Sequence, residues 1–203
     1  MRRIKNTKSP SKKVLFLGYD ETQTKLINAL VDRNCLVDHT KEKINSIIDY
    51  DFVVSYGYRH IIKSDLINST ESPIFNLHIS YLPFNRGAHP NFWSFYENTP
   101  AGVTIHLIDE GVDTGPIVSQ KYVNFKKQDD TFAKTYKILN IEIENLFIAC
   151  LNSFLEGTWS SEKQKGLGTH HYVKDLPLNF SGWNANIEEE IKKLKFEGLK
   201  YER

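Results

Sequence analysis

Short apolar runs that alternate with amphipathic stretches constrain the fold of this chain more than any other sequence feature. A run of about five apolar residues bounded by polar or turn residues fits a buried strand. Strands that alternate with helices imply right-handed βαβ crossovers and a mainly parallel sheet. The expected strands of the first half are Val14–Gly18, Cys35–Asp38, Asp51–Ser55 and Ile74–His78.

Helical spacing fills the intervals between these strands. Asp20 and Gln23 resemble a capping pair ahead of an apolar face in Leu26–Val31. Shorter helices are expected at Ile61–Asn68 and, after a proline, at Asn91–Glu97. The first half therefore predicts helices that cover a sheet.

The longest expected helix runs from Asp130 to Glu156 and comes after two further strands, Val103–Leu107 and Pro116–Val123. Its apolar residues recur every three or four positions and so share one face, which predicts a core helix that stops at Gly157. These residues are Phe132, Tyr136, Leu139, Ile143, Phe147, Cys150 and Phe154. The sequence predicts an α/β fold whose sheet is mainly parallel, Rossmann-like and flanked by helices.

The length of 203 residues favours one domain with an appended element. We expect a basic flexible tail at residues 1–12, a main domain at 13–157 and a short C-terminal extension at 158–203 that could form a β-hairpin, a helix and a dimer contact. The extension starts as a polar segment. It ends in Ile187–Glu202, which is rich in charge and predicts an exposed or partner-facing helix.

The charge balance, with 26 Lys and Arg against 25 Asp and Glu, gives no indication of a nucleic-acid-binding protein. The basic start has no secretory h-region of about 7–15 apolar residues behind it, and no apolar run approaches the ~20 residues of a membrane span. Cys35 and Cys150 are expected to be buried thiols. These observations together predict a cytoplasmic protein.

The chemically suggestive residues lie between Asn76 and Gly115. Asn76 and His78 are two positions apart on one expected strand, so their side chains project to the same face. His78 ends that strand, and open α/β sheets bind ligands beyond the carboxyl ends of their strands. Asp113 lies in a glycine-bracketed turn that can bring a carboxylate to the histidine. This trio suits chemistry in which an oxyanion forms while a proton moves.

Taken alone, the same residues also have plain structural interpretations. A histidine at a strand end can simply face solvent, Asn76 can stabilise a turn, and Asp113-Thr-Gly can be a tight turn. No Ser, Cys or Thr nucleophile with a matching base stands out, so a covalent acyl-enzyme is not favoured.

The order of the motifs around the trio supports a more specific interpretation. Asn76-x-His78 is followed by Leu82-Pro83, Arg86-Gly87, Gly102-Val103-Thr104 and Asp109–Gly115. Over residues 14–155 this order resembles the folate-dependent formyltransferases, a family that includes glycinamide ribonucleotide transformylase, methionyl-tRNA formyltransferase and the nucleotide-sugar N-formyltransferases.

The resemblance implies direct transfer of a formyl group from 10-formyltetrahydrofolate, a co-substrate, to an amine. Asn76 and His78 would stabilise the oxyanion, and His78 assisted by Asp113 would manage the protons. No metal is implied. The resemblance places the pterin between a segment after the third strand and the turn that holds Asp113. The cofactor-binding residues so implied are Tyr58, Arg59, Ile61, Asp109, Glu110, Gly111 and Val112.

The C-terminal extension and the first turn narrow the choice of amine acceptor within this family. Methionyl-tRNA formyltransferases carry a large basic C-terminal domain, whereas only about 45 residues come after Gly157 here. Purine transformylases have a phosphate-binding element where this chain has GYDETQT. The segment NLHISYLPFNRGAHPNFWSF most resembles enzymes that formylate amino sugars linked to dTDP.

Several residues are expected to bind that sugar nucleotide. Arg86, beside Gly87, could pair with a pyrophosphate through its forked guanidinium, while His89 could shape the sugar pocket. Tyr81 and Trp183 are candidates for stacking on thymine, although aromatic residues at such places are more often part of the core.

The predicted substrate is dTDP-4-amino-4,6-dideoxyglucose, formylated for a surface polysaccharide such as an O-antigen. Open alternatives are a 3-amino dTDP sugar, another small amine, a formyltetrahydrofolate hydrolase, or a binding protein without catalysis. The resemblance also suggests a homodimer that contacts neither nucleic acid nor membrane.

Overall fold

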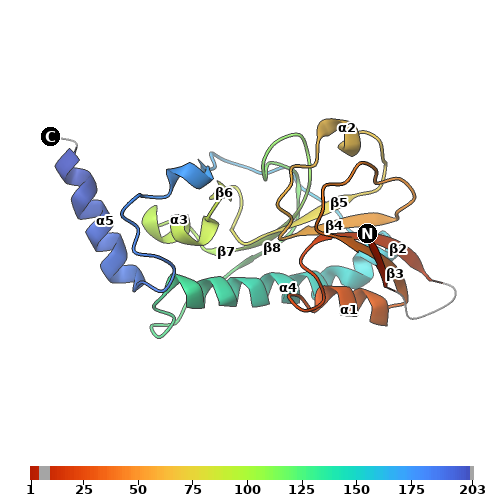
Figure 1. The fold of residues 1–203 in the computed structure, drawn as a ribbon, viewed down its shortest axis with the longest axis horizontal. Coiled ribbons are helices and arrows are strands. Elements are labelled where there is room, and N and C mark those ends of the chain that lie inside the picture. The colour runs from red at the N-terminus through yellow and green to blue at the C-terminus, as the bar shows by residue number, and fades with distance from the viewer. Residues whose placement is uncertain (5–9, 202–203) are drawn as a thin grey trace.

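A seven-stranded mixed sheet organises the computed structural model, which describes residues 1–4 and 10–201 (Figure 1). The strand order across the sheet is β1-β3-β2-β4-β5-β7-β8. The central strands β3, β2, β4 and β5 are parallel, whereas β1, β7 and β8 pair antiparallel. In chain order the strands are β1 (Arg2–Ile4), β2 (Lys12–Gly18), β3 (Cys35–Thr40), β4 (Phe52–Tyr56), β5 (Ile74–His78), β7 (Gly102–Leu107) and β8 (Ile117–Tyr122).

The helices and a second, two-stranded sheet complete the fold. Strands β6 (Arg86–Gly87) and β9 (His170–His171) have two residues each and pair in parallel. The helices are α1 (Leu26–Asp32), α2 (Ser64–Ile67), α3 (Pro90–Tyr96), α4 (Phe132–Glu156), the 3-10 turn η1 (Val173–Asp175) and α5 (Ile187–Tyr201). The predicted α/β class with a mainly parallel central sheet is confirmed. The C-terminal bound expected for α5, Glu202, lies outside the described residues.

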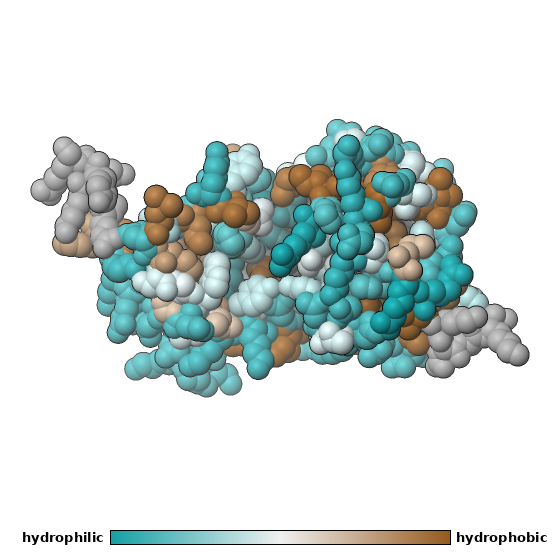
Figure 2. Space-filling view, viewed as in Figure 1, coloured by the Kyte–Doolittle hydropathy of each residue, from teal (hydrophilic) through white to brown (hydrophobic). Residues whose placement is uncertain are grey.

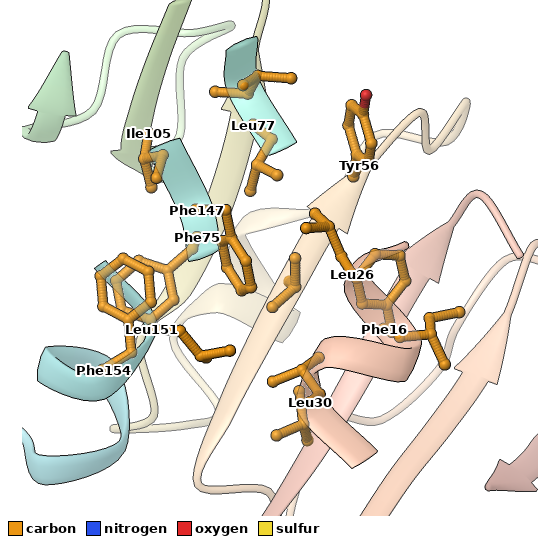
Figure 3. Close-up of a cluster of buried hydrophobic side chains, with 14 of the residues drawn as sticks. Phe16, Leu26, Leu30, Tyr56, Phe75, Leu77, Ile105, Phe147, Leu151 and Phe154 are labelled. Atoms are coloured by element: carbon orange, nitrogen blue, oxygen red, sulfur yellow. The ribbon is translucent and has the colours of Figure 1, made fainter. Parts of the chain in front are cut away.

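The long helix α4 and the short helix α1 lie against one face of the sheet (Figure 1). Their buried side chains meet those of the strands in one cluster, in which the rings of Phe75 and Phe154 stack with centroids 4.4 Å apart (Figure 3). Among the described helices α4 alone is long and apolar enough to cross a membrane, but Phe147 and its neighbours on one face are buried in this core. The predicted core helix is therefore confirmed.

Three details of the sequence-based expectation are wrong. Arg2–Ile4 are not a free tail, because they form β1, and the Arg3 guanidinium donates two hydrogen bonds, of 2.8 and 3.0 Å, to the buried Asp38. The rest of the expected tail includes residues 5–9, which lie outside the described part of the chain. Helix α2 is shorter than predicted, and Tyr136 of α4 is 44% exposed rather than core.

A second apolar cluster fills the opposite face of the sheet, beneath α2 and the loop after β3. It includes Leu15, Leu17 and Val53. A third cluster joins α3, the start of α4 and α5, and in it Leu194 packs near Phe92 and Phe132. Figure 2 shows a largely hydrophilic surface on the viewed side, broken by separate apolar patches. The main sheet is thus covered on both faces, and its strand ends are left for the site.

Candidate active site

The strand pair β5–β7 positions the first polar side chains of the site. Asn76 and His78 lie on β5, as the two-residue spacing predicts. The antiparallel register sets His106 opposite Asn76 and Thr104 opposite His78. Because paired residues share a face of the sheet, the strand pair presents an amide and two imidazoles side by side.

Asp113 reaches these side chains from the turn between β7 and β8. Its Oδ2 atom lies 3.6 Å from His78 Nδ1 and its Oδ1 atom 3.3 Å from His106 Nε2. Asn76 Nδ2 donates to Oδ1 at 3.1 Å, and the backbone N–H of Gly87 donates to Oδ2 at 2.9 Å. The structure therefore brings together the three residues that the sequence nominated as catalytic.

The turn is tight enough to require glycine after the carboxylate. A Cβ at Gly115 would lie 1.8 Å from the carbonyl oxygen of Leu107, so no side chain fits there. Asp113 itself has a φ of 53°, in the left-handed region that residues with side chains rarely adopt. The surrounding contacts must hold this conformation against its local cost.

His106 completes the cluster and was not predicted from the sequence. Its Nδ1 lies 2.8 Å from the carbonyl oxygen of Leu107 and must therefore carry a proton, while Nε2 lies 3.1 Å from Asn76 Nδ2. The side chain is 2% exposed. The signal was present in the strand, since Thr104 and His106 are polar residues at alternating positions within an otherwise apolar run.

The electrostatics of the cluster favour an ionised Asp113. Burial by itself raises the pKa of this carboxyl, but His78, His106 and the Gly87 N–H outweigh burial and hold the pKa well below its usual range. A carboxylate fixed in this way can accept a hydrogen bond from the N–H of a neighbouring imidazole and stabilise that imidazole when it is charged.

His78 is held from both sides of its ring. Nε2 lies 3.0 Å from the carbonyl oxygen of Asn85, so it donates its proton there, and Nδ1 faces Asp113. Asn85 is fully buried, and its side chain bonds Thr99 and Thr169. The imidazole is thus oriented so that a proton on Nδ1 points at the carboxylate.

The loop after β5 supplies the predicted sugar-nucleotide residues. Gly87 has a φ of 82°, and its Cβ position would lie 2.3 Å from the carbonyl oxygen of His171. The Arg86 guanidinium donates to Gln164 Oε1 through Nε at 3.0 Å and Nη2 at 2.6 Å. His89 precedes α3, and its ring centroid lies 5.2 Å from that of Trp183. The structure thus gives Arg86 a fixed partner and sets His89 beside Trp183.

Tyr81, a candidate for stacking on thymine, already has an aromatic partner within the protein. Its ring stacks on Tyr122 with centroids 3.6 Å apart, and the hydrogen bond between the two hydroxyls, with burial, raises the pKa of Tyr81 to about 12. One face of the ring is therefore already covered by protein.

The residues expected to bind the cofactor fall into two groups. Tyr58 has a structural contact, because its hydroxyl donates to the carbonyl oxygen of Glu42 at 2.9 Å. Asp109 accepts from the N–H of Gly111 and from Thr114, and so shapes the turn. The remaining side chains project outward, with Ile61 80% and Val112 46% exposed and with Arg59 and Glu110 on the surface.

Two surface hollows, of about 390 and about 450 Å³, lie away from the trio. The first is lined by residues of β8 and the start of α4, and the second by Tyr19, Tyr56 and Tyr136. Within residues 1–4 and 10–201, no group of three or more His, Cys, Asp or Glu side chains is arranged to hold a metal ion.

Comparison with known proteins adds to this geometry. Residues 17–150 match the family model described as formyl transferase. The dTDP-4-amino-4,6-dideoxyglucose formyltransferase of Mycobacterium bovis is 27% identical over 136 residues, which cover 66% of this chain and 57% of that protein. A methionyl-tRNA formyltransferase of Clostridium beijerinckii is 28% identical over 163 residues, covering 79% of this chain and 50% of that protein. The chain thus spans about half the length of these relatives.

A solved structure provides a match over nearly the whole length. The formyltransferase PseJ from Anoxybacillus kamchatkensis, in complex with UDP-4,6-dideoxy-4-formamido-L-AltNAc and tetrahydrofolate, is 38% identical with a TM-score of 0.81, covering 89% of this chain and 98% of that one. A 4-N formyltransferase from Francisella tularensis shares the fold, with 21% identity and a TM-score of 0.74 over 90% of this chain and 87% of the other.

The matched residues 17–150 include Asn76, His78 and Asp113, so the family match and the clustered side chains concern the same part of the molecule. The chain belongs to the formyl transferase family.

Proposed function

We propose that this protein transfers a formyl group from 10-formyltetrahydrofolate to the 4-amino group of a nucleotide-linked 4-amino-4,6-dideoxy sugar. The observation that carries the proposal is the closed cluster of Asn76, His78 and Asp113 at the carboxyl end of β5. It provides an amide donor, an imidazole and an ionised carboxylate within one network. The likeness to a 38% identical sugar formyltransferase supports the choice of acceptor.

The residues divide the chemistry as their contacts suggest. His78 takes the proton that the attacking amine loses and holds it on Nδ1, where the Asp113 carboxylate faces the ring. It returns this proton to the folate nitrogen as the bond between that nitrogen and the formyl carbon breaks. Asn76 and the charged imidazole stabilise the oxygen that becomes negative during transfer. In the structure both Asn76 Nδ2 contacts point to Asp113 and His106, so the amide has to turn a donor outward to act on that oxygen.

The folate co-substrate supplies the formyl carbon when bound. Exposed apolar side chains on the two segments assigned to its pterin, Ile61 at 80% and Val112 at 46%, support this assignment because they offer apolar surface to a ring. Tyr58 and Asp109 would support these segments rather than contact the ring, since their polar atoms already bond protein groups.

Two nucleotide sugars are the leading acceptors. The sequence-based expectation is dTDP-4-amino-4,6-dideoxyglucose, which is the substrate named for the 27% identical mycobacterial relative. The second candidate is a UDP-linked 4-amino sugar of the altrose type, because the 38% identical PseJ was solved with the corresponding formamido product. In either case Arg86 is the proposed pyrophosphate ligand through the guanidinium edge that Gln164 leaves free.

The test is incubation with 10-formyltetrahydrofolate and a panel of dTDP- and UDP-linked 3-amino and 4-amino sugars, followed by mass spectrometry of the products. We expect a gain of one formyl group on a 4-amino sugar. If only a 3-amino sugar is formylated, the acceptor is the 3-amino group and the proposed 4-amino acceptor is wrong. Formate release that does not depend on any sugar would replace transfer with hydrolysis, and no reaction of the folate at all would leave only a binding function.

Further expectations from the sequence remain part of this proposal. The protein is proposed to be a cytoplasmic homodimer that serves surface polysaccharide synthesis without contact to nucleic acid or membrane. Apolar side chains on the C-terminal extension support self-association, since Leu167 is 96%, Val173 72% and Leu178 105% exposed. Sedimentation equilibrium at several concentrations would report a monomer if this part of the proposal is wrong.

A further inference from the structure

We propose that Gln164, in the C-terminal extension, is a positioning residue that holds the backbone turn of Asp113 in its active conformation. The residue lies outside residues 17–150, which match the family model. The kinetic consequences rest on the proposed function, whereas the structural ones do not.

The side-chain amide of Gln164 is fully used. Its Nε2 atom donates to the carbonyl oxygen of Asp113 at 2.8 Å and to that of Gly115 at 2.9 Å. Its Oε1 atom accepts hydrogen bonds from Nε and Nη2 of Arg86. A glutamine amide has two donors and two acceptor positions, so every one of them is satisfied. Turning the amide over would set oxygen against two carbonyls, which fixes its orientation.

The turn that Gln164 holds needs external support. Asp113 is a non-glycine residue with a φ of 53°, a left-handed conformation that is unfavourable for a residue with a side chain unless its surroundings enforce it. The two carbonyls that Gln164 binds belong to this strained residue and to Gly115, two positions further along the chain. The carboxylate therefore points at His78 and His106 because its own backbone is clamped from the extension.

Backbone pairing fixes Gln164 in turn. Glu162 forms an isolated antiparallel bridge with Ile117 at the start of β8, with hydrogen bonds of 2.7 and 2.8 Å. Beyond Gln164, β9 pairs with Arg86 and Gly87. The extension is therefore held by backbone pairing before Gln164, at Glu162, and after it, at β9. Gln164 lies between these two paired segments.

Gln164 also joins the two sides of the substrate site. One side of its amide holds the Asp113 turn, and the other orients the Arg86 guanidinium. The neighbouring Gly87 N–H binds the Asp113 carboxylate directly. Loss of Gln164 should thus disturb the position of the carboxylate first and the position of the arginine second.

Substitution can separate these two effects. Gln164→Glu keeps the shape and the acceptor toward Arg86 but removes both donors to the turn, whereas Gln164→Ala removes both halves. Gln128→Glu is the matched control, because it makes the same charge change at an exposed glutamine. Circular dichroism and cooperative thermal unfolding establish that each variant is folded, and the near-isosteric Gln164→Glu keeps the test possible if the alanine variant does not fold.

The first readout does not require activity. Carbon-13 NMR of the Asp113 carboxyl should give a pKa well below the usual range in the wild type and in Gln128→Glu, and a pKa displaced toward its usual value in both Gln164 variants. The reason is that the carboxylate would leave His78, His106 and the Gly87 N–H. An unchanged pKa of the Asp113 carboxyl in folded Gln164 variants would overturn the proposal.

The second readout is the split between kcat and KM with the acceptor sugar identified by the panel. Gln164→Glu should lower kcat by about 10- to 100-fold, in the range expected when a catalytic group is misplaced by about 1 Å, with little change in KM. Gln164→Ala should lower kcat and also raise the KM for the sugar nucleotide. Unchanged kcat in both variants would refute the positioning role. A wild type that formylates nothing would refute the proposed function, and the carboxyl titration would still decide the role of Gln164.

Discussion

At the scale of single residues, the site is organised around one carboxylate rather than around one histidine. Asp113 contacts His78, His106, Asn76 and the backbone of Gly87. The placement of these polar groups therefore depends on the position of the carboxylate. Among the described residues, the hydrogen-bond partner of His78 besides this carboxylate is the Asn85 carbonyl oxygen. Removing the carboxylate should therefore do more than remove one charge.

The first prediction concerns turnover. His78→Asn and Asp113→Asn should each lower kcat by about 100-fold or more, because each removes a proton carrier or the group that orients it. Binding of the sugar nucleotide should stay nearly unchanged, as isothermal titration calorimetry can measure. Near wild-type turnover in either variant would contradict the assigned mechanism.

The second prediction concerns acid stability. The folded pKa of Asp113 lies below its unfolded value, so ionised Asp113 stabilises the fold at pH values above the unfolded pKa of about 4. That contribution is lost as the pH falls through the folded pKa. Asp113→Asn should therefore be less stable than the wild type near neutral pH, and the difference should shrink below pH values of about 4. Urea unfolding across this pH range measures the difference, and a gap that does not vary with pH would count against the carboxylate contacts.

The third prediction separates binding from chemistry at Arg86. Arg86→Ala should raise the KM for the sugar nucleotide several-fold and leave kcat within about a factor of three, because a pyrophosphate contact is the same in the ground and transition states. Lys126→Ala provides an exposed control. A pure kcat effect would show that Arg86 acts through Gln164 on the Asp113 turn instead.

The sequence indicated part of this site for definite physical reasons. Asn76 and His78 could be paired because strand periodicity is strict, and Asp113 because glycine marks its turn. His106 was missed because the antiparallel register between β5 and β7, which sets it opposite Asn76, depends on tertiary structure and cannot be obtained from local sequence. Gln164 was missed because a lone polar residue in an irregular segment carries no pattern.

At the scale of elements, apolar density decided what could be predicted. The central strands and α4 bury long apolar runs, and their positions matched expectation within a few residues. Strand β1 could not be foreseen, because its two arginines form ion pairs, Arg3 with the buried Asp38 of β3 and Arg2 with Glu21, instead of burying apolar surface. Helix α2 ends after four residues, and none of its residues is buried.

The fourth prediction addresses the packing of α4 on the sheet. Phe147 is fully buried between the helix and the strands (Figure 3), so Phe147→Ala should lower the free energy of unfolding by about 3–5 kcal/mol. Ile141→Ala on the exposed side of the same helix, where the side chain is 47% exposed, should change it by less than about 1 kcal/mol. Equal effects at the two positions would mean that this face of α4 does not carry the core.

At the scale of the whole molecule, the C-terminal extension is the part that sequence patterns described least. It was expected to be a short extension with a hairpin and a helix. In the structure Glu162 bridges to Ile117 of β8, His170 and His171 pair with β6, and Leu194 of α5 packs near α3 and α4. The sequence shows no periodic pattern for these contacts, because two-residue strands and single bridges are too short to produce a hydrophobic periodicity.

The parallel pairing of β6 with β9 also has a consequence for how the protein is made. A ribosome releases the strands of the main sheet, the trio and α4 before it releases Gln164 and His171, because all of them precede residue 157. The nascent chain can therefore bury its main core while the turn of Asp113 still lacks its clamp. The contacts between Gln164 and the Asp113 turn can therefore form only after the strands of the main sheet and α4 have been synthesised.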